Sequence, residues 1–311
     1  MSQDFSLSLP DLTDKTVIVT GANSGIGYHT ACELGKAHAT VILACRNLDK
    51  GNDALKRMQE NIKGDNLHLM SLDLSDLSSV RDFVKDFTDK FSKLDILINN
   101  AGIMAIPKRT LNNQGWEIQF ATNHLGHYAL TGLLLSHLLK TDSSRVVTVS
   151  SLAHGRGQIN LKDLQGEKHY SPWQAYAQTK LANLLFAFEL DRLLKENKLS
   201  PISVACHPGV SKTNIISTGV QVDGQMTLIG QFMTAMTGIF AQSDYAGALP
   251  TIWAATDKSV AGGCYYGPDG IGEVRGLPKL VKAKSKAYDV KLAKNLWLLS
   301  QELTGVNFEF N

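Results

Sequence analysis

A tyrosine and a lysine stand at Tyr176 and Lys180, in a stretch whose apolar pattern predicts a long helix from Trp173 to Glu196. Residues at i and i+4 share one helix face, with Cβ atoms about 6 Å apart. A tyrosine titrates near 10, so proton transfer at neutral pH needs a shift of about 3 units, worth roughly 4 kcal/mol. One ammonium at about 4 Å supplies about that much at an effective dielectric near 20. The pair therefore predicts acid/base chemistry at a substrate oxygen.

Ser151 extends this prediction, because it directly follows a predicted strand from Arg145 to Ser150. A hydroxyl at a strand end can donate a hydrogen bond to a carbonyl oxygen on which negative charge develops, while Tyr176 delivers the proton. A Tyr-x-x-x-Lys pair taken alone is more often an exposed helix pair than a catalytic one. Its distance from the serine-ended strand favours the catalytic interpretation.

Three glycines lie between a predicted strand, Lys15 to Val19, and a predicted helix, Tyr28 to Lys36. They belong to the run Thr20-Gly21-Ala22-Asn23-Ser24-Gly25-Ile26-Gly27. Gly21 permits a sharp turn, Gly25 lets backbone approach a pyrophosphate, and Gly27 lets the helix pack close to the strand. The phosphates would bind the free N–H groups at the helix N-terminus, where the helix dipole favours negative charge. The run predicts a dinucleotide site, although a tight turn without ligand is the alternative for an isolated glycine triplet.

The next predicted strand, Thr40 to Cys45, indicates which dinucleotide binds. In dinucleotide-binding folds an acidic residue about 20 positions past the glycine loop binds the ribose 2′-hydroxyl, and an arginine there accommodates a 2′-phosphate. Here Arg46 follows the strand, and the first carboxylate is Asp49. The Arg46 guanidinium offers a bidentate fork to a phosphate, and Asn23 and Ser24 can add hydrogen bonds. NADP is favoured over NAD; the alternative is that Arg46 is a solvated residue after a strand.

Strands and helices alternate along most of the chain, which predicts βαβ units with right-handed crossovers. Besides the elements already given, the pattern indicates strands at Leu67–Leu72, Leu94–Asn99, Pro201–Cys206 and Gly263–Tyr266, and helices at Asp49–Ile62, Asp76–Phe91 and Gln114–Leu139. We therefore expect an α/β fold with a doubly wound, mostly parallel, seven-stranded Rossmann-like sheet and helices on both faces. We expect residues 1–311 to form a single domain, in which only residues 210–242 and the C-terminal extension 268–311 escape the alternation.

The composition argues against several classes of function. The net charge is +2, from 31 basic and 29 acidic residues without a basic block, so nucleic-acid binding is not expected. The four cysteines lack C-x-x-C pairing and indicate small core residues in a reducing compartment. The N-terminus has no signal-like apolar region, and no apolar stretch is long enough to span a membrane. We expect a cytoplasmic protein without a transmembrane segment.

Two histidines, His124 and His127, stand three positions apart on the predicted helix Gln114–Leu139. No cysteine, histidine or carboxylate joins them at a metal-like spacing. We interpret both as helix-surface or packing residues and expect no metal site.

Three motifs in fixed order resemble the short-chain dehydrogenase/reductase family. They are Thr20-Gly21-x-x-x-Gly25-x-Gly27, Asn99-Asn100-Ala101-Gly102 and Tyr176-x-x-x-Lys180. Within that family the chain is similar to the retinol dehydrogenase-like branch. The residues that carry this likeness are Val149-Ser150-Ser151-Leu152-Ala153-His154, Leu164-Gln165-Gly166-Glu167-Lys168 and Lys180-Leu181-Ala182-Asn183. The match runs from about Leu12 to Gly267 and implies an oxidoreductase with a nicotinamide cofactor.

The resemblance also implies roles for single residues. Ser151 would orient the substrate oxygen, and Asn123 would complete a proton relay through a water. Tyr176 would be the general acid/base, helped by Lys180 and by the positive charge of an oxidised nicotinamide. Asp73 would bind the adenine edge, with Leu74 beside it in the cofactor site. The other implied cofactor contacts are Asn100, Ala101 and Gly102 on the ribose side, and Pro208, Gly209, Val210 and Thr213 at the nicotinamide end.

Residues 210–242 carry many apolar side chains, among them Met226, Phe232 and Met236, and one basic residue, Lys212. Apolar residues at helical spacing usually form core, and an adaptable apolar lid over a lipophilic substrate is an equal alternative. No cluster of Arg or Lys is present there to receive a carboxylate or phosphate. We therefore expect a small lipophilic carbonyl or alcohol as substrate. A homo-oligomer is compatible with the sequence.

Two functions from different classes fit these observations. The first is an NADP-dependent alcohol dehydrogenase or carbonyl reductase. The second is a catalytically idle NADP-binding or redox-sensing module that keeps the fold. The complete set Asn123, Ser151, Tyr176 and Lys180 favours the enzyme, because an idle module would be free to lose members of it.

Overall fold

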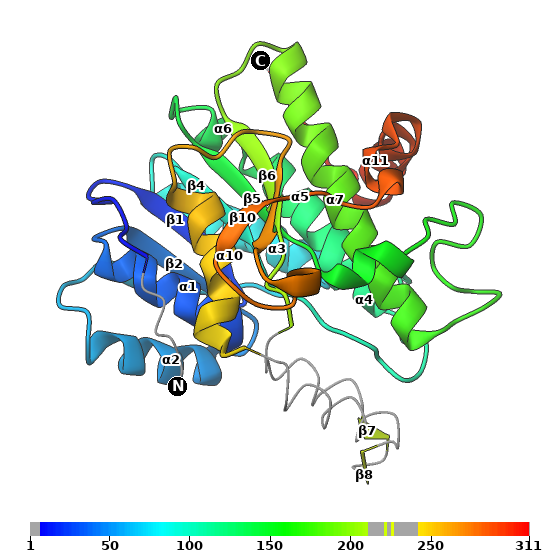
Figure 1. Ribbon diagram of the computed structural model, residues 1–311, viewed down its shortest axis with the longest axis horizontal. Helices are drawn as coiled ribbons and strands as arrows, with labels where there is room; N and C mark the ends of the chain where they lie inside the picture. The colour runs from blue at the N-terminus through cyan, green and yellow to red at the C-terminus, as the bar shows by residue number, and fades with distance from the viewer. Residues whose placement is uncertain (1–6, 211–220, 223–224, 227–241, 311) are drawn as a thin grey trace.

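One sheet of eight strands forms the centre of the computed structural model, which describes residues 7–210, 221–222, 225–226 and 242–310 (Figure 1). In spatial order the strands are β10 (Pro278–Val281), β9 (Tyr265–Pro268), β6 (Ile202–Cys206), β5 (Arg145–Val149), β4 (Ile96–Asn99), β1 (Thr16–Thr20), β2 (Thr40–Cys45) and β3 (Leu67–Ser71). All neighbours are parallel except β9 and β10. Two short strands outside this sheet, β7 (Gln221–Val222) and β8 (Gln225–Met226), pair with each other.

The doubly wound α/β fold expected from the sequence is confirmed, but the number of strands is not. We expected seven strands, and the eighth, β10, lies in the tail that the alternating pattern left out. It is four residues long, begins with a proline and runs along the sheet edge, where Leu280 is 61% exposed. A short edge strand with exposed side chains has no buried apolar run to mark it.

Helices cover both faces of the sheet. One face carries α1 (Gly25–Lys36), α2 (Leu48–Gln59) and α10 (Asp244–Thr256), and the other carries α3 (Leu77–Lys90), α5 (Gly126–Leu133) and α7 (Pro172–Glu196) (Figure 1). The alternation of side chains along β1 supplies both layers: Val17 and Val19 pack with Leu34 of α1, whereas Ile18 packs with Phe83 of α3. Because β1 is buried on both sides, every one of its residues is buried.

The strand order reverses between β1 and β4, which pair in parallel through Val17 and Ile96. Chain connections leave this pair in opposite directions, so the loops after Thr20 and Asn99 bound an open crevice at the carboxyl ends of the strands. Open α/β sheets bind their ligands at this position. The fold therefore brings the glycine run and the Asn99-Asn100-Ala101-Gly102 motif to the same edge.

The predicted helix Gln114–Leu139 begins later than expected and is not regular. It comprises α4 (Ile118–Phe120), the π-helical turn η1 (Ala121–Leu125), α5 and α6 (Leu135–Leu138). Glu117 ends the preceding loop by accepting a hydrogen bond from the backbone N–H of Phe120 at 2.8 Å. A single π turn inserts one extra residue per turn and is found often at functional sites. Here it contains Asn123.

The C-terminal extension contains a full helix, α11 (Val290–Thr304), which packs on the outer side of α7 (Figure 1). Asp289 caps its first turn by accepting from the backbone N–H of Leu292, and Gly305 follows it with a φ of 62°. Buried residues recur at Ala293, Leu296, Trp297 and Ser300. The sequence analysis placed this segment outside the strand–helix alternation and assigned it no helix. Among the described helices, none has the length and apolarity needed to cross a membrane.

Candidate active site

The glycine run turns as expected between β1 and α1. Gly21 and Gly25 have φ values of 68° and 57°, in the left-handed region that favours glycine. A Cβ on Gly27 would lie 2.4 Å from the carbonyl oxygen of Gly21 and 2.5 Å from Nδ2 of Asn100, so only glycine fits there. Ser24 begins α1 without a side-chain cap, which leaves the N–H groups of the first turn open to a ligand.

A threonine hydroxyl joins the two strand ends that bound the crevice. Oγ1 of Thr20 accepts hydrogen bonds from the backbone N–H groups of Asn100 and Ala101, both at 2.9 Å. The Asn100 side chain returns the contact, because its Nδ2 donates to the carbonyl oxygen of Thr20 at 2.7 Å. These bonds hold Asn100, Ala101 and Gly102 against the glycine run.

The same threonine reaches the π turn through a buried histidine. Nε2 of His127 lies 2.9 Å from Oγ1 of Thr20, and Nδ1 lies 3.1 Å from the carbonyl oxygen of Asn123. A carbonyl only accepts, so Nδ1 carries the proton and Nε2 accepts from the threonine hydroxyl. Burial lowers the pKa of His127 to about 4, which keeps the ring neutral.

Asn123 itself is completely buried and does not line the cavity described below. Its Oδ1 accepts from the backbone N–H of Ile103 at 2.8 Å, and its Nδ2 donates to the carbonyl oxygen of Ile103 and to Oγ1 of Thr179. Every polar atom of the side chain is used in these contacts. The side chain therefore fixes the loop after β4 against α7.

A cavity of about 500 Å³ runs along the carboxyl edge of the sheet, a size within the usual range for small-molecule sites. It is lined by nearly every described residue that the sequence placed in the site. Those residues are Gly21, Asn23, Ser24, Gly25, Ile26, Gly27, Arg46, Asp73, Leu74, Asn100, Ala101, Gly102, Ser151, Tyr176, Lys180, Pro208, Gly209 and Val210. Thr213, the lid residues Phe232 and Met236, and the rest of 227–241 lie outside the described residues.

Three polar side chains meet at one end of the cavity. Ser151 follows β5, and Tyr176 and Lys180 lie on α7. Nζ of Lys180 donates to the carbonyl oxygen of Val149 at 3.1 Å and lies 5.7 Å from the centre of the Tyr176 ring. The Ser151 hydroxyl is hydrogen-bonded to Tyr176 and accepts from the backbone N–H of Ala153 at 3.2 Å.

Burial dominates the protonation of this pair. It raises the pKa of Tyr176 to about 12, against a smaller lowering by the Ser151 hydrogen bond, and it lowers the pKa of Lys180 to about 8. We expected the nearby ammonium to bring the pKa of Tyr176 close to 7. In the protein without a bound cofactor this expectation does not hold. At neutral pH the tyrosine keeps its proton and the lysine is charged.

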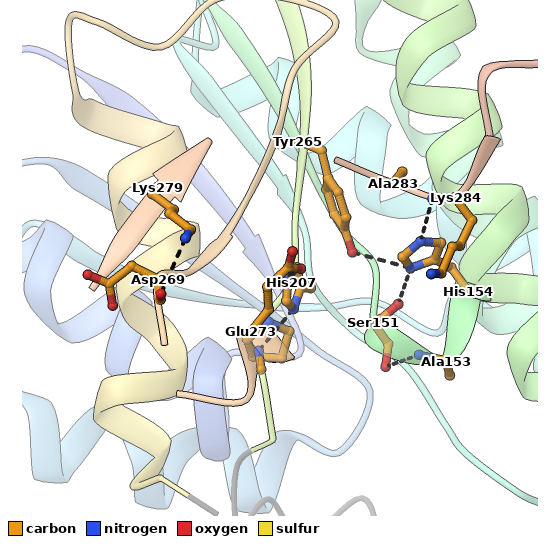
Figure 2. A network of polar contacts seen from close by, with 12 residues as sticks. Ser151, Ala153, His154, His207, Tyr265, Asp269, Glu273, Lys279, Ala283 and Lys284 are labelled. Carbon is orange, nitrogen blue, oxygen red and sulfur yellow. Dashed lines mark hydrogen bonds and ion pairs between the residues drawn. The ribbon is translucent and has the colours of Figure 1, made fainter. Parts of the chain in front are cut away.

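The far wall of this end follows β6. Nδ1 of His207 accepts from the backbone N–H of Gly209 at 3.2 Å, and Nε2 contacts a carboxylate oxygen of Glu273 at 3.1 Å (Figure 2). Val210 is fixed twice, since its N–H donates to the carbonyl oxygen of Val274 and its own carbonyl accepts from the N–H of Gln242. The Pro208–Val210 turn is thus anchored on the C-terminal extension.

Comparison with known proteins agrees with this geometry. A family model described as "short chain dehydrogenase" matches residues 15–221. The chain belongs to the short-chain dehydrogenase family. The family assignment drawn from the three sequence motifs is therefore confirmed, and with it an oxidoreductase of the retinol dehydrogenase-like kind.

Curated relatives match almost the whole of this short-chain dehydrogenase. Retinol dehydrogenase 12 of Mus musculus is 38% identical, with 95% of this chain and 88% of the relative covered. Retinol dehydrogenase 13 of Homo sapiens is 37% identical over 94% of this chain and 85% of the relative. At 95% and 94% coverage of this chain, both alignments include at least part of the C-terminal extension.

Solved structures show the same fold. An uncharacterized protein from Mycobacterium Paratuberculosis is 42% identical, with 97% of both chains covered and a TM-score of 0.78. A short chain dehydrogenase from Shigella flexneri, complexed with NADP, has a TM-score of 0.62 at 23% identity, with 83% of this chain and 98% of that chain covered.

Sequence reasoning missed several residues that line the cavity of this short-chain dehydrogenase. Lys50 and Asn47 stand near Arg46 at the start of α2, and Met104 and Trp173 lie beside Tyr176. Lys50 had a usable signal, because it stands four positions after Arg46. Met104 and Trp173 had none, since their contact with Tyr176 depends on how the loop after β4 meets the start of α7.

The two histidines of the π-turn region pack inside the short-chain dehydrogenase. His127 contacts Thr20, and Nε2 of His124 lies 2.8 Å from Oγ of Ser300 on α11. Both rings are buried. Within the described residues, no three histidine, cysteine or carboxylate side chains are grouped as metal ligands would be.

The lowered pKa of Lys180 can be measured directly. We expect its amine to titrate near pH 8 in the free protein, because burial penalises the ammonium, whereas exposed lysines titrate near 10.4. The measurement is an NMR titration of the lysine Cε resonances, with Lys180→Met used to assign the signal that disappears. A Lys180 resonance that titrates together with the exposed lysines would contradict the burial argument.

Proposed function

We propose that this protein is an NADP(H)-dependent oxidoreductase that interconverts a lipophilic carbonyl compound and its alcohol, with Tyr176 as general acid/base. One observation carries the proposal: Ser151, Tyr176 and Lys180 share a single cavity with the glycine run at the N-terminus of α1. A dinucleotide bound on the glycine run would extend toward the tyrosine. Membership of the family supports nicotinamide chemistry. The choice of NADP, the lipophilic substrate and the role of Tyr176 are inferred from the residues of the cavity.

The residues present fit a phosphate-bearing dinucleotide. Gly27 lets the first turn of α1 pack directly against the Gly21 carbonyl and Asn100, where a Cβ would clash, and the open N–H groups at the start of α1 favour a pyrophosphate. When bound, the nicotinamide supplies the hydride. Ser151 then donates a hydrogen bond to the substrate oxygen, and Tyr176 gives up its proton to the same oxygen. Lys180 keeps a positive charge beside the ring on which negative charge remains.

The protonated state of Tyr176 supports carbonyl reduction as the direction for which the free protein is prepared. A tyrosine with a pKa of about 12 carries its proton at neutral pH and can donate it without prior ionisation. Alcohol oxidation needs the tyrosinate first. The charge on Lys180, present below pH 8 or so, stabilises the tyrosinate that reduction leaves behind.

The choice of NADP rests on the residues at the end of β2. Arg46 and Lys50 line the cavity there, so two positive charges face the position of a 2′-phosphate. The carboxylate that would bind a 2′-hydroxyl is absent from the strand end, where Cys45 is followed by Arg46. Both charges favour the phosphorylated cofactor.

The substrate end supports a lipophilic ligand. Met104 and Ala105 form an apolar cluster with the Tyr176 ring, and Ala153 and Trp173 pack against it. Lys180 is the one cation of the described lining at this end, and its ammonium already lies beside the Tyr176 ring and donates to the carbonyl oxygen of Val149. A substrate carboxylate or phosphate would therefore lack a partner among the described residues, whereas an alkyl chain or polyene would cover the indole ring.

A redox-sensing module is the weaker alternative. Sensor cysteines need accessible thiols with lowered pKa values. Here burial raises the pKa of Cys45 to about 11 and of Cys206 to about 12, and it also raises the pKa of Cys32. These thiols suit a reducing compartment, so we propose the cytoplasm as the location.

Removal of the tyrosine hydroxyl tests the catalytic assignment. Tyr176→Phe should lower the rate of aldehyde reduction by roughly a hundred- to ten-thousandfold, because the proton donor is lost. NADPH affinity, measured by fluorescence titration, should stay within about twofold. Tyr128→Phe is the matched control, since that buried hydroxyl has no hydrogen-bond partner within the described part of the chain. A Tyr176→Phe variant that keeps more than about a tenth of the rate would show another proton path.

Charge reversal at the end of β2 tests the cofactor choice. Arg46→Asp should weaken NADPH binding by roughly 2 kcal/mol, about thirtyfold, because a charged hydrogen bond is lost and repulsion is added. NADH binding should change little. Lys56→Asp, an exposed charge reversal on the following helix α2 and outside the cavity lining, serves as control. Equal affinity of the unmodified protein for NADH and NADPH would count against the assignment.

A homologous series of straight-chain aldehydes tests the apolar end. Each buried methylene contributes about 0.8 kcal/mol, so kcat/KM should rise by roughly fourfold per carbon until the pocket is full. Trp173→Ala should flatten this dependence, and Trp173→Phe should retain most of it, with NADPH affinity unchanged in both. An unmodified protein that shows no dependence on chain length, or that prefers a keto acid, would contradict a lipophilic substrate.

A further inference from the structure

The backbone of Ser151 is fixed by a single histidine. The carbonyl oxygen of Ser151 accepts from the backbone N–H of His154 at 3.0 Å and from Nδ1 of the same residue at 2.7 Å (Figure 2). Both lone pairs of that carbonyl are therefore occupied. A displacement of the Ser151 backbone, which would move the Cα that carries the hydroxyl, has to break both bonds.

The opposite side of the His154 ring is held by the C-terminal extension. The backbone N–H of Lys284 donates to Nε2 of His154 at 3.2 Å (Figure 2). Lys284 directly precedes η4 (Ser285–Tyr288), and the Lys286 side chain of that turn donates to the carbonyl oxygen of Gly157. Two separate contacts thus join this part of the extension to the residues that follow Ser151.

The two backbone partners of the ring define its protonation. A carbonyl oxygen can only accept, so Nδ1 must carry a hydrogen; a backbone N–H can only donate, so Nε2 must present a lone pair. The ring is therefore neutral, in the Nδ1–H tautomer. His154 is 5% exposed and stands edge-on to the Tyr265 ring, with centroids 5.5 Å apart, so the ring is largely shielded from solvent.

Burial and the neighbouring Lys284 and Lys286 ammonium groups lower the pKa of His154, which agrees with the neutral ring. The groups that face it from the other elements are Tyr265 on β9 and the Ser151 backbone. No carboxylate is among its described partners.

We propose that His154 is a positioning residue for Ser151, and that the backbone N–H of Lys284 sets the tautomer in which His154 does this. The C-terminal extension then contributes to turnover without touching the substrate. This proposal rests on the proposed function, because it concerns the direction of the Ser151 hydroxyl toward a substrate oxygen.

The substitution Lys284→Pro removes the backbone N–H that donates to Nε2 of His154. The φ of Lys284 is −64°, which proline adopts without strain, and proline has no N–H to donate. Lys284→Ala is the matched control, since it keeps the N–H and removes the side chain. We expect Lys284→Pro to lower kcat for aldehyde reduction by about three- to tenfold, the effect of misplacing one neutral hydrogen bond. NADPH affinity should be the same in both variants.

Two substitutions of the histidine provide an independent test. Asn presents an N–H donor at the position of Nδ1, and Gln presents its amide at the position of Nε2. His154→Asn should therefore keep the bond to Ser151 and most of kcat, whereas His154→Gln should lose as much as Lys284→Pro. This pair also decides the matter if the proline variant fails to fold, and thermal unfolding of each variant reports that.

The tautomer itself is observed by ¹⁵N NMR of the histidine rings. We expect the Nδ1–H form at His154 in the unmodified protein and in Lys284→Ala, and its loss in Lys284→Pro. An Nε2–H ring in the unmodified protein, or equal kcat values for Lys284→Pro and Lys284→Ala, overturns the proposal. Absence of any turnover in the unmodified protein overturns the proposed function instead, while the NMR result still reports the tautomer.

Discussion

The hydroxyl of Thr20 is the contact on which the geometry of the site depends. It accepts from two backbone N–H groups at the end of β4 and donates to His127, so one oxygen joins β1, β4 and α5. In sheets of this kind the strands stay paired at the switch point, but the chain connections that follow them diverge to opposite faces. Without a link there, the glycine run and the catalytic helices would be positioned by different layers of the core. Thr20 gives them a common reference.

Low polarity around the reacting groups has opposite effects on the two partners. It holds the proton on Tyr176 and makes the charge on Lys180 less stable, because burial raises the pKa of the tyrosine to about 12 and lowers the pKa of the lysine to about 8. Two groups whose pKa values nearly coincide in water are therefore set well apart in the protein. The ammonium is nevertheless kept near the ring by a hydrogen bond to the carbonyl of Val149. Electrostatic support is therefore built before any ligand arrives, and reorganisation during reaction is small.

Much of the fold was predictable because local pattern and global topology agree. Buried β-branched runs such as Thr16–Thr20 mark central strands, and the glycine run marks the first strand–helix junction. The features that escaped prediction depend on tertiary contacts. The strand β10 is defined only by its pairing with β9. The π turn at Asn123 is held by contacts of the Asn123 side chain with Ile103 and Thr179, which are distant in sequence, and by a contact of the Asn123 carbonyl with His127, which the turn itself creates.

The residues of the site show the same difference between local sequence pattern and tertiary contact. Residues carried by motifs were found in the cavity, because a motif encodes its own local geometry. The protonation of Tyr176 was misjudged because the sequence shows a neighbouring charge but not the amount of burial. Trp173 and Met104 were missed because an apolar wall has no spacing rule. The helix α11 did have a detectable sequence pattern. Its buried residues recur at helical spacing on one face, at Ala293, Leu296, Trp297 and Ser300.

The bond between Val210 and Gln242 has a consequence for how this protein can diversify. The carbonyl of Val210 accepts from the N–H of Gln242, so the stretch between them leaves and re-enters the scaffold at one point. Closing a longer or shorter connection across a fixed gap changes the free energy only with the logarithm of its length. Whole segments can therefore be exchanged at this junction, in evolution or by grafting, while the cofactor edge of the sheet is left as it is. The length of this segment and the geometry of the cofactor edge can therefore vary independently.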